Sequence, residues 1–189
     1  MYIEQFDGGI LYKGAIDTDR AHKAARIARA FLRYDASLFF KPPINDVLDS
    51  YSRVMKAWVQ YPQGSKLYPS IENDYIDCEG GWGKKAVEFL TTLANDVDAL
   101  THIESDTRFI QIYMPESMIA AHTDKVSSKI IGLVGQGIFK IHDPINNDVI
   151  LQKVLVEEGD VLQFHGVGMH SAVNCSPIQP RYTLGLIDK

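Results

Sequence analysis

Cysteines, long apolar runs and phosphate-loop motifs are scarce or absent in this chain, and each absence removes a class of protein from consideration. The two cysteines, Cys78 and Cys175, stand far apart and form no C-x-x-C pair, so we expect neither a disulfide scaffold nor a zinc knuckle. No run of about 18 apolar residues occurs, so no membrane-spanning helix is expected. The glycine cluster at 80–83 lacks the Gly-Lys-Ser/Thr ending of a phosphate-binding loop.

The pattern of a leader segment is missing as well. The chain starts MYIEQFDGG, without a basic stretch followed by an apolar one, so we expect no signal peptide. Together with the two distant cysteines, this start favours a reduced, cytoplasmic setting.

Length and charge indicate how the chain is organised. Its 189 residues, without repeats or linkers, favour a single domain over 1–189, with a helical support and lid region over 1–104 and the core over 105–189. The net charge of −5 is uneven, because residues 1–66 carry 10 Lys and Arg against 7 Asp and Glu while the remainder carries 9 against 17. This asymmetry indicates two surfaces with different partners.

The first 104 residues are predicted to be mainly helical after an initial hairpin of two strands, Tyr2–Phe6 and Ile10–Tyr12. Caps and apolar spacing predict three helices: Asp17 or Thr18 to about Arg33, Asn45 to about Gln60, and about Lys84 to Leu100. Basic residues of the first helix fall opposite its apolar stripe and are interpreted as a solvated face. Residues 61–83 form a long irregular stretch that favours a lid. Four of its residues are candidates for substrate contact, with loop packing an equally good explanation: Tyr68, Tyr75, Asp77 and Trp82.

After residue 105 the chain changes to short segments rich in Ile, Val, Leu and Phe, separated by turn residues. Eight strands are predicted: Arg108–Met114, Met118–His122, Lys129–Val134, Ile138–His142, Val149–Val156, Val161–His165, His170–Cys175 and Arg181–Ile187. Eight is the number of strands in a jelly roll, whose two sheets leave a cavity between them. The fold class is therefore α+β, a jelly roll of about eight strands with the N-terminal helices packed on one sheet.

A His-Thr-Asp sequence ends the stretch from 109 to 124, FIQIYMPESMIAAHTD. In an extended segment His122 and Asp124 point to the same side, which supplies two corners of a 2-His-1-carboxylate site suited to Fe(II). An H-x-D pair alone is a weak signal. The far end of the chain adds two candidate third ligands, His165 and His170, and an Arg-x-Thr sequence that begins at Arg181.

These residues resemble the motifs of the iron(II)/2-oxoglutarate-dependent oxygenases, nearest to their plant-type and isopenicillin-synthase-like branch. The first motif of that family reads N-x-Y-x-x-G-x-x-I-x-x-H-x-D, and four of its positions are in register here: Tyr113, Ile119, His122 and Asp124. Gln111 stands where Asn is usual and Glu116 where Gly is usual. The segments GIFKIHDP, GDVLQFHG and HSAVNCSPIQPRYTLGL are similar to later family motifs, with Thr183 where Ser is usual. The resemblance covers about residues 105–187.

The resemblance implies a double-stranded β-helix core, another name for the jelly roll, and a set of site residues. Its metal ligands are His122, Asp124 and His170, because Arg181 follows His170 by eleven residues, close to the family interval, but follows His165 by sixteen. Three residues are expected to bind the far carboxylate of 2-oxoglutarate: Arg181, Thr183 and Tyr113. The implied cofactors are Fe(II), 2-oxoglutarate and dioxygen, with ascorbate as a support. The implied reaction is oxidative decarboxylation of 2-oxoglutarate to succinate, coupled to hydroxylation of a substrate, here expected to be a small molecule.

Three alternatives stay open. A cupin-like metalloprotein that does not use 2-oxoglutarate is disfavoured, because cupins favour H-x-H. A binding module without turnover is disfavoured by the intact residue set. The same chemistry on a peptide or a nucleic-acid base is a further option, and the acidic balance disfavours the nucleic acid. The other histidines, His22, His102 and His142, are interpreted as structural or surface residues, and Cys175 as a small buried apolar residue.

Overall fold

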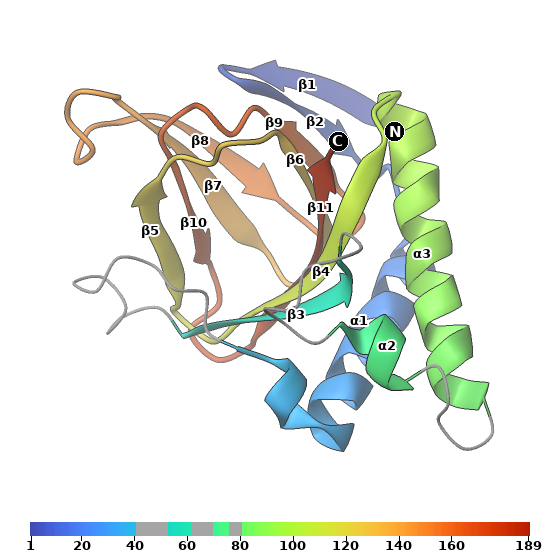
Figure 1. Cartoon of the computed structure of the whole chain (residues 1–189). Coiled ribbons are helices and arrows are strands. Elements are labelled where there is room, and N and C mark those ends of the chain that lie inside the picture. Colours follow the sequence, from blue (N-terminus) through green and yellow to red (C-terminus); the bar gives the residue numbers. More distant parts are fainter. Residues whose placement is uncertain (41–52, 62–69, 76–80) are drawn as a thin grey trace.

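The computed structural model describes residues 1–40, 53–61, 70–75 and 81–189 (Figure 1). Its helical elements are α1 (Thr18–Tyr34), the short 3-10 helix η1 (Ala36–Leu38), α2 (Ile71–Tyr75) and α3 (Trp82–Thr101). Its strands are β1 (Tyr2–Phe6), β2 (Gly9–Lys13), β3 (Val54–Gln60), β4 (Ser105–Tyr113), β5 (Met118–His122), β6 (Ser128–Val134), β7 (Gly137–His142), β8 (Ile150–Val156), β9 (Val161–Phe164), β10 (His170–Asn174) and β11 (Arg181–Asp188). Among these described helices, none has both the length and the apolar character needed to cross a membrane.

The strands form two facing sheets, as Figure 1 shows. The larger sheet has seven strands in the order β1-β2-β9-β6-β11-β4-β3, and the smaller has four in the order β5-β10-β7-β8. Strands β4 to β11, the eight that the sequence predicts, contribute four strands to each sheet. The hairpin β1–β2 and strand β3 lengthen the larger sheet at its two ends. This arrangement confirms the predicted jelly roll.

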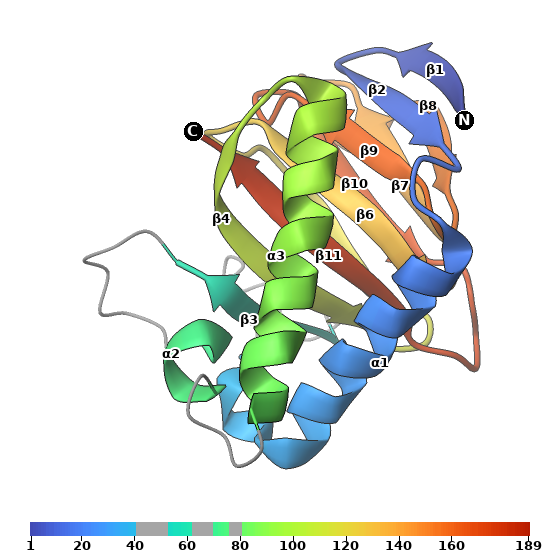
Figure 2. The same cartoon turned by 90° about the vertical axis from the view of Figure 1, so that its right-hand side faces the viewer.

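The helices cover the outer face of the larger sheet (Figure 2). Helix α1 begins where predicted, because the Asp17 carboxylate accepts hydrogen bonds from the backbone N–H groups of Asp19 and Arg20 at 3.0 and 3.2 Å. Its buried stripe includes Phe31, which shares a core with alternate residues of the strands beneath, such as Leu184. The prediction that the helices pack on one face of the larger sheet is therefore confirmed.

The predicted helix from Asn45 to Gln60 is wrong over its second half, because Val54–Gln60 is strand β3; residues 41–52 lie outside the described part. Both faces of this strand are covered, so its apolar residues do not alternate cleanly with polar ones and fit a helical spacing as well. Ala57 and Val59 face the helices, whereas Lys56 faces the smaller sheet. Antiparallel pairing with β4 decides the conformation.

The candidate substrate contacts between 61 and 83 divide into two pairs. Tyr68 and Asp77 lie outside the described residues. Tyr75 and Trp82 pack their rings against Phe31 of α1, with ring centroids 4.9 and 5.3 Å apart. These two aromatic residues therefore support the helical layer and do not line the space between the sheets.

Cys175 also differs from its prediction as a small buried residue, since its side chain is exposed. It follows the last residue of β10, where the chain leaves the sheet and only its backbone is held, by donation of its N–H to the Gln136 carbonyl at 3.0 Å. Exposure at a strand end removes the packing role that the sequence pattern indicated.

Candidate active site

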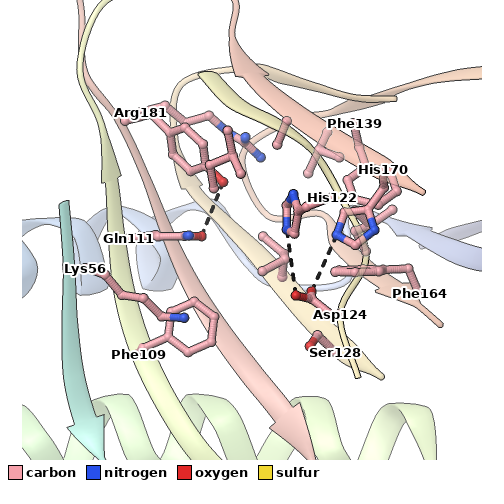
Figure 3. Close-up of a pocket in the computed structure, with 16 residues that line it drawn as sticks. Lys56, Phe109, Gln111, His122, Asp124, Ser128, Phe139, Phe164, His170 and Arg181 are labelled. Atoms are coloured by element: carbon pink, nitrogen blue, oxygen red, sulfur yellow. Dashed lines mark hydrogen bonds and ion pairs between the residues drawn. The ribbon is translucent and has the colours of Figure 1, made fainter. Parts of the chain in front are cut away.

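A cavity of about 240 Å³ lies between the two sheets. Side chains alternate between the two faces of a strand, and this decides which residues line the cavity. On β4, Phe109, Gln111 and Tyr113 face the cavity, whereas Ile110 and Ile112 face the helices. Most of the wall is apolar: Ile119, Ile130, Phe139, Val156, Leu162, Phe164 and Ala172. The cavity therefore combines a mainly apolar wall with polar side chains that point into it (Figure 3).

His122, Asp124 and His170 gather at one side of this cavity. His122 ends β5 and His170 begins β10, and the two residues are direct partners in the antiparallel pairing of these strands. One ligand atom from each of the three residues lies within 4.8 Å of the others. The Asp124 oxygens are 3.4 Å from His170 Nε2 and 3.7 Å from His122 Nε2, and Figure 3 shows both rings directed at the carboxylate. The arrangement has the donor set of a facial metal site.

Backbone carbonyls orient both imidazoles. His122 Nδ1 donates to the Ala120 carbonyl at 2.7 Å, and His170 Nδ1 donates to the Gly168 carbonyl at 2.8 Å. A carbonyl oxygen can only accept, so in a neutral ring the proton is on Nδ1 and the lone pair is on Nε2. Such a hydrogen bond behind the ring is the usual support of a metal-binding histidine. Both Nε2 atoms are thus prepared to bind a cation.

A glycine loop positions Asp124. The Asp124 backbone N–H donates to the Gly166 carbonyl at 2.6 Å. A Cβ atom added to Gly166 would meet Asp124 Cβ at 2.7 Å, which is closer than real Cβ atoms approach other atoms. The absence of a side chain at Gly166 therefore lets the carboxylate stand beside the histidines.

The charge states in the metal-free protein favour metal binding. Burial opposes ionisation of Asp124, but the hydrogen bond with His170 and the attraction to His122, His170 and Lys56 outweigh it and lower the pKa of Asp124. Burial is the main cause that lowers the pKa of His122. At neutral pH the carboxylate is ionised and the His122 ring is neutral, which are the forms that bind a metal ion.

The remaining histidines lie away from this cluster, and one of them, His102, caps the C-terminus of α3. His165 is exposed, and its Nδ1 lies 3.3 Å from the Ser127 hydroxyl. His22 Nε2 is 2.7 Å from a Glu158 carboxylate oxygen. His142 Nε2 is 2.8 Å from the Ser171 hydroxyl. Within the part of the chain that the structure describes, the metal-ligand geometry thus includes His170 and leaves His165 out.

The other polar end of the cavity is built around Arg181. Its side chain is buried, with its guanidinium carbon 5.2 Å from the centroid of the Tyr113 ring. Arg181 Nε has no hydrogen-bond partner among the described residues, and burial lowers the pKa of the guanidinium. A buried cation without an acceptor is costly, so this end of the cavity is suited to an anion.

Thr183 and Tyr113 flank this cation. Thr183 is fully buried on the same face of β11, and its hydroxyl has no partner among the described residues, although the residue is not part of the cavity wall. The Tyr113 hydroxyl donates to Gln111 Oε1 at 3.2 Å, and burial raises the pKa of Tyr113 so that it stays a donor. The three residues expected from the resemblance therefore lie close together.

Lys56 is a charged cavity residue that the sequence analysis does not anticipate. The pattern there predicts a helix, whereas on β3 the Lys56 side chain enters the cavity beside Phe109. A lysine within an apolar segment is the local signal at this position, and it fits a helical spacing as well as a strand.

The chain is similar to known proteins in its structure and not detectably in its sequence. No family model and no curated protein sequence matches the chain. Among solved structures, OsALKBH1 superposes with a TM-score of 0.60 at 14% identity, over 100% of both chains. A prolyl hydroxylase from Trichoplax adhaerens, in complex with a peptide fragment of hypoxia inducible factor, gives a TM-score of 0.62 at 12% identity, over 96% of this chain and 83% of the other.

A further solved structure shares the fold. SnoN, a non-heme α-ketoglutarate-dependent epimerase from nogalamycin biosynthesis, gives a TM-score of 0.64 at 14% identity and covers 96% of this chain and 77% of its own. α-Ketoglutarate is another name for 2-oxoglutarate. At these identities the likeness shows the fold alone, and it agrees with the two-sheet topology. The chain therefore has the double-stranded β-helix fold of the iron(II)/2-oxoglutarate-dependent oxygenases, as the sequence resemblance predicts.

Proposed function

We propose that this protein is an Fe(II)- and 2-oxoglutarate-dependent oxygenase that hydroxylates a small-molecule substrate. The observation that carries the proposal is one cavity with two prepared ends. At one end the Nε2 atoms of two histidines and a carboxylate converge, and at the other lies the buried guanidinium of Arg181, whose Nε has no hydrogen-bond partner among the described residues. Bound Fe(II) and 2-oxoglutarate would supply oxidative decarboxylation, in which substrate R–H, dioxygen and 2-oxoglutarate give R–OH, succinate and carbon dioxide.

His122, Asp124 and His170 would hold the metal from one side. Two imidazoles and one carboxylate suit Fe(II) and leave its remaining coordination positions open for small ligands. The fit rests on the donor set and on the orientation of the rings, since both Nδ1 atoms are occupied by carbonyls. The protein would thus hold three ligands of the metal ion and leave the coordination positions on its opposite side open.

Arg181 would bind the far carboxylate of 2-oxoglutarate. A guanidinium presents two parallel N–H donors that match a carboxylate, and its burial strengthens the interaction. Thr183 and Tyr113 would add hydroxyl donors beside it. Arg181, Thr183 and Tyr113 are all buried, so a carboxylate bound there would exchange its hydration for these fixed donors.

The size and setting of the cavity support a small substrate. At about 240 Å³ the cavity lies just below the range for drug-sized ligands, and 2-oxoglutarate would take part of it. The basic residues of α1, such as Arg26 and Arg29, lie on the helical layer over the outer face of the larger sheet, whereas the cavity lies at its inner face. A nucleic acid held by that helix would not present its bases to the site. A peptide could enter only through a protruding side chain.

Two measurements test the proposal. Addition of 2-oxoglutarate to the anaerobic Fe(II) protein should produce a metal-to-ligand charge-transfer band, and His170→Ala should abolish it while His165→Ala keeps it. In air, a screen of small molecules with Fe(II) and 2-oxoglutarate, run with and without ascorbate, should identify compounds that increase succinate formation. A wild-type protein that binds Fe(II) but never forms the band would favour a cupin-like metalloprotein instead.

A further inference from the structure

Lys56 occupies a fixed position in the cavity, on a strand outside the eight-stranded jelly roll. Its backbone pairs with Gln111 of β4 on one side. On the other side it exchanges two hydrogen bonds with Phe40, at 2.8 and 2.9 Å. The backbone is thus held from both sides, and the side chain lines the same cavity as the cluster of His122, Asp124 and His170.

The Lys56 ammonium group lies against aromatic faces. Nζ is 3.6 Å from the ring centroid of Phe109 and 4.6 Å from that of Trp58. Phe109 is itself fixed, because its ring fills the space that a side chain at Gly185 would occupy. Aromatic faces attract a cation but do not replace three hydrogen-bond acceptors. Within the described residues Lys56 forms no ion pair and donates no side-chain hydrogen bond.

The charge of Lys56 has no assigned use in the proposed reaction. Burial lowers the pKa of Lys56 to about 8, against the opposing effect of Asp124, so the group is still mostly charged at neutral pH. When Asp124 binds a metal ion, its negative charge is shared with that ion, and Lys56 is left as a cation facing a mainly apolar cavity wall. Arg181 is the other cation there, and it already has a partner in the far carboxylate of 2-oxoglutarate.

The two cations are too far apart to share one small carboxylate. Lys56 and Arg181 lie on strands that flank β4, opposite Gln111 and Tyr113 respectively. Two strand spacings across and two residues along place their Cα atoms roughly 12 Å apart. The charged ends do not converge either, because Lys56 Nζ lies over the Phe109 ring, whereas the Arg181 guanidinium lies beside Tyr113, four residues further along β4. Figure 3 shows the side chains on the two sides of Gln111, with Lys56 toward Asp124. The cavity therefore offers a second site for an anionic group, separate from that of the co-substrate.

We propose that Lys56 binds a carboxylate of the primary substrate, and hence that the substrate is a small carboxylic acid. The inference rests on the proposed function and adds a substrate class to it. A carboxylate carries one negative charge and matches a single ammonium group. A phosphate group carries about −1.5 to −2 at neutral pH and three acceptor oxygens, which need more donors than Lys56 alone provides. A cationic substrate would be repelled by both Lys56 and Arg181.

The test uses straight-chain monocarboxylates from propanoate to hexanoate, each beside its amide, as probes of the protein loaded with Zn(II) and 2-oxoglutarate. Calorimetric titration should show that at least one acid binds at least tenfold more tightly than its amide. Lys56→Met should abolish that preference, Lys56→Arg should keep part of it, and the control Lys153→Met, on the exposed side of β8, should keep all of it. Lys56→Met should retain the Fe(II)–2-oxoglutarate charge-transfer band, which also shows that the variant is folded.

Four other results can be told apart, and each contradicts either the binding of a substrate carboxylate by Lys56 or the proposed function. Wild-type protein that binds acids and amides equally well overturns the proposal, and this comparison needs no variant. Equal acid preference in Lys56→Met and wild type overturns it as well. Loss of the charge-transfer band in Lys56→Met, with an intact near-ultraviolet circular dichroism spectrum, would assign Lys56 to 2-oxoglutarate instead. A wild type that forms no band refutes the proposed function itself, a result distinct from a band that forms without any acid preference.

Discussion

Replacing Arg181 by alanine should weaken 2-oxoglutarate binding by about 2–5 kcal/mol, the usual cost of truncating one partner of a buried charge pair. At 1.4 kcal/mol for each tenfold change, this corresponds to an increase in Kd of roughly 30-fold to several thousand-fold. The structure favours a loss of this size, because Arg181 is 3% exposed and its Nε has no other acceptor among the described residues. After the replacement, the incoming carboxylate would keep only the neutral donors near it.

Titration of 2-oxoglutarate into the anaerobic Fe(II) protein, followed by the charge-transfer band, measures this Kd directly. Arg181→Lys should fall between the alanine variant and wild type, since an ammonium group lacks the two-donor fork. Metal binding should survive in both variants, because the three ligands are untouched. Arg26→Ala, an exposed arginine on α1, is the matched control and should leave the Kd unchanged. An unchanged Kd in Arg181→Ala would remove Arg181 from the co-substrate site.

Three further predictions follow from the site. His170→Ala should lose Fe(II) or Mn(II) binding in equilibrium dialysis while His165→Ala retains it, and the reverse result would reassign the third ligand. Gly137→Ala should weaken 2-oxoglutarate binding at least tenfold without changing any charge, because the added methyl group would meet the Arg181 guanidinium. The titration of 2-oxoglutarate into the anaerobic Fe(II) protein measures this, and an unaffected Kd would show that Arg181 can move aside. Lys56→Met should raise the free energy of unfolding of the metal-free protein at pH 7 by at most about 3 kcal/mol, measured by urea unfolding. The limit follows because the folded-state pKa of Lys56, about 8, is 2.5 units below the ordinary 10.5, and each unit corresponds to about 1.36 kcal/mol. The unfolded chain binds more protons between pH 8 and 10.5, so wild-type stability rises with pH in that window and the advantage of the variant should vanish above it; a variant advantage that stays constant with pH would contradict the lowered pKa.

Local sequence patterns determined much of the fold. The eight strands after residue 105 and the hairpin before α1 are present, because alternation and turn residues act within a few positions of the chain. The start of α1 follows in the same way from the Asp17 cap. The H-x-D pair is equally local, since its two side chains share a strand end.

The tertiary structure decided the parts that depend on residues far apart in the chain. The interval to Arg181 already favours His170 over His165 in the sequence, but the physical reason is tertiary, because β10 pairs with β5 and sets His170 opposite His122. The strand character of 54–60 depends on β4, and without that pairing Lys56 has no reason to enter the cavity. Gly166 is needed because its carbonyl, in a loop some forty residues further along the chain, accepts a hydrogen bond from the Asp124 backbone N–H, and a side chain there would meet Asp124. Such contacts follow from which strands meet, and local preference carries no information about that pairing.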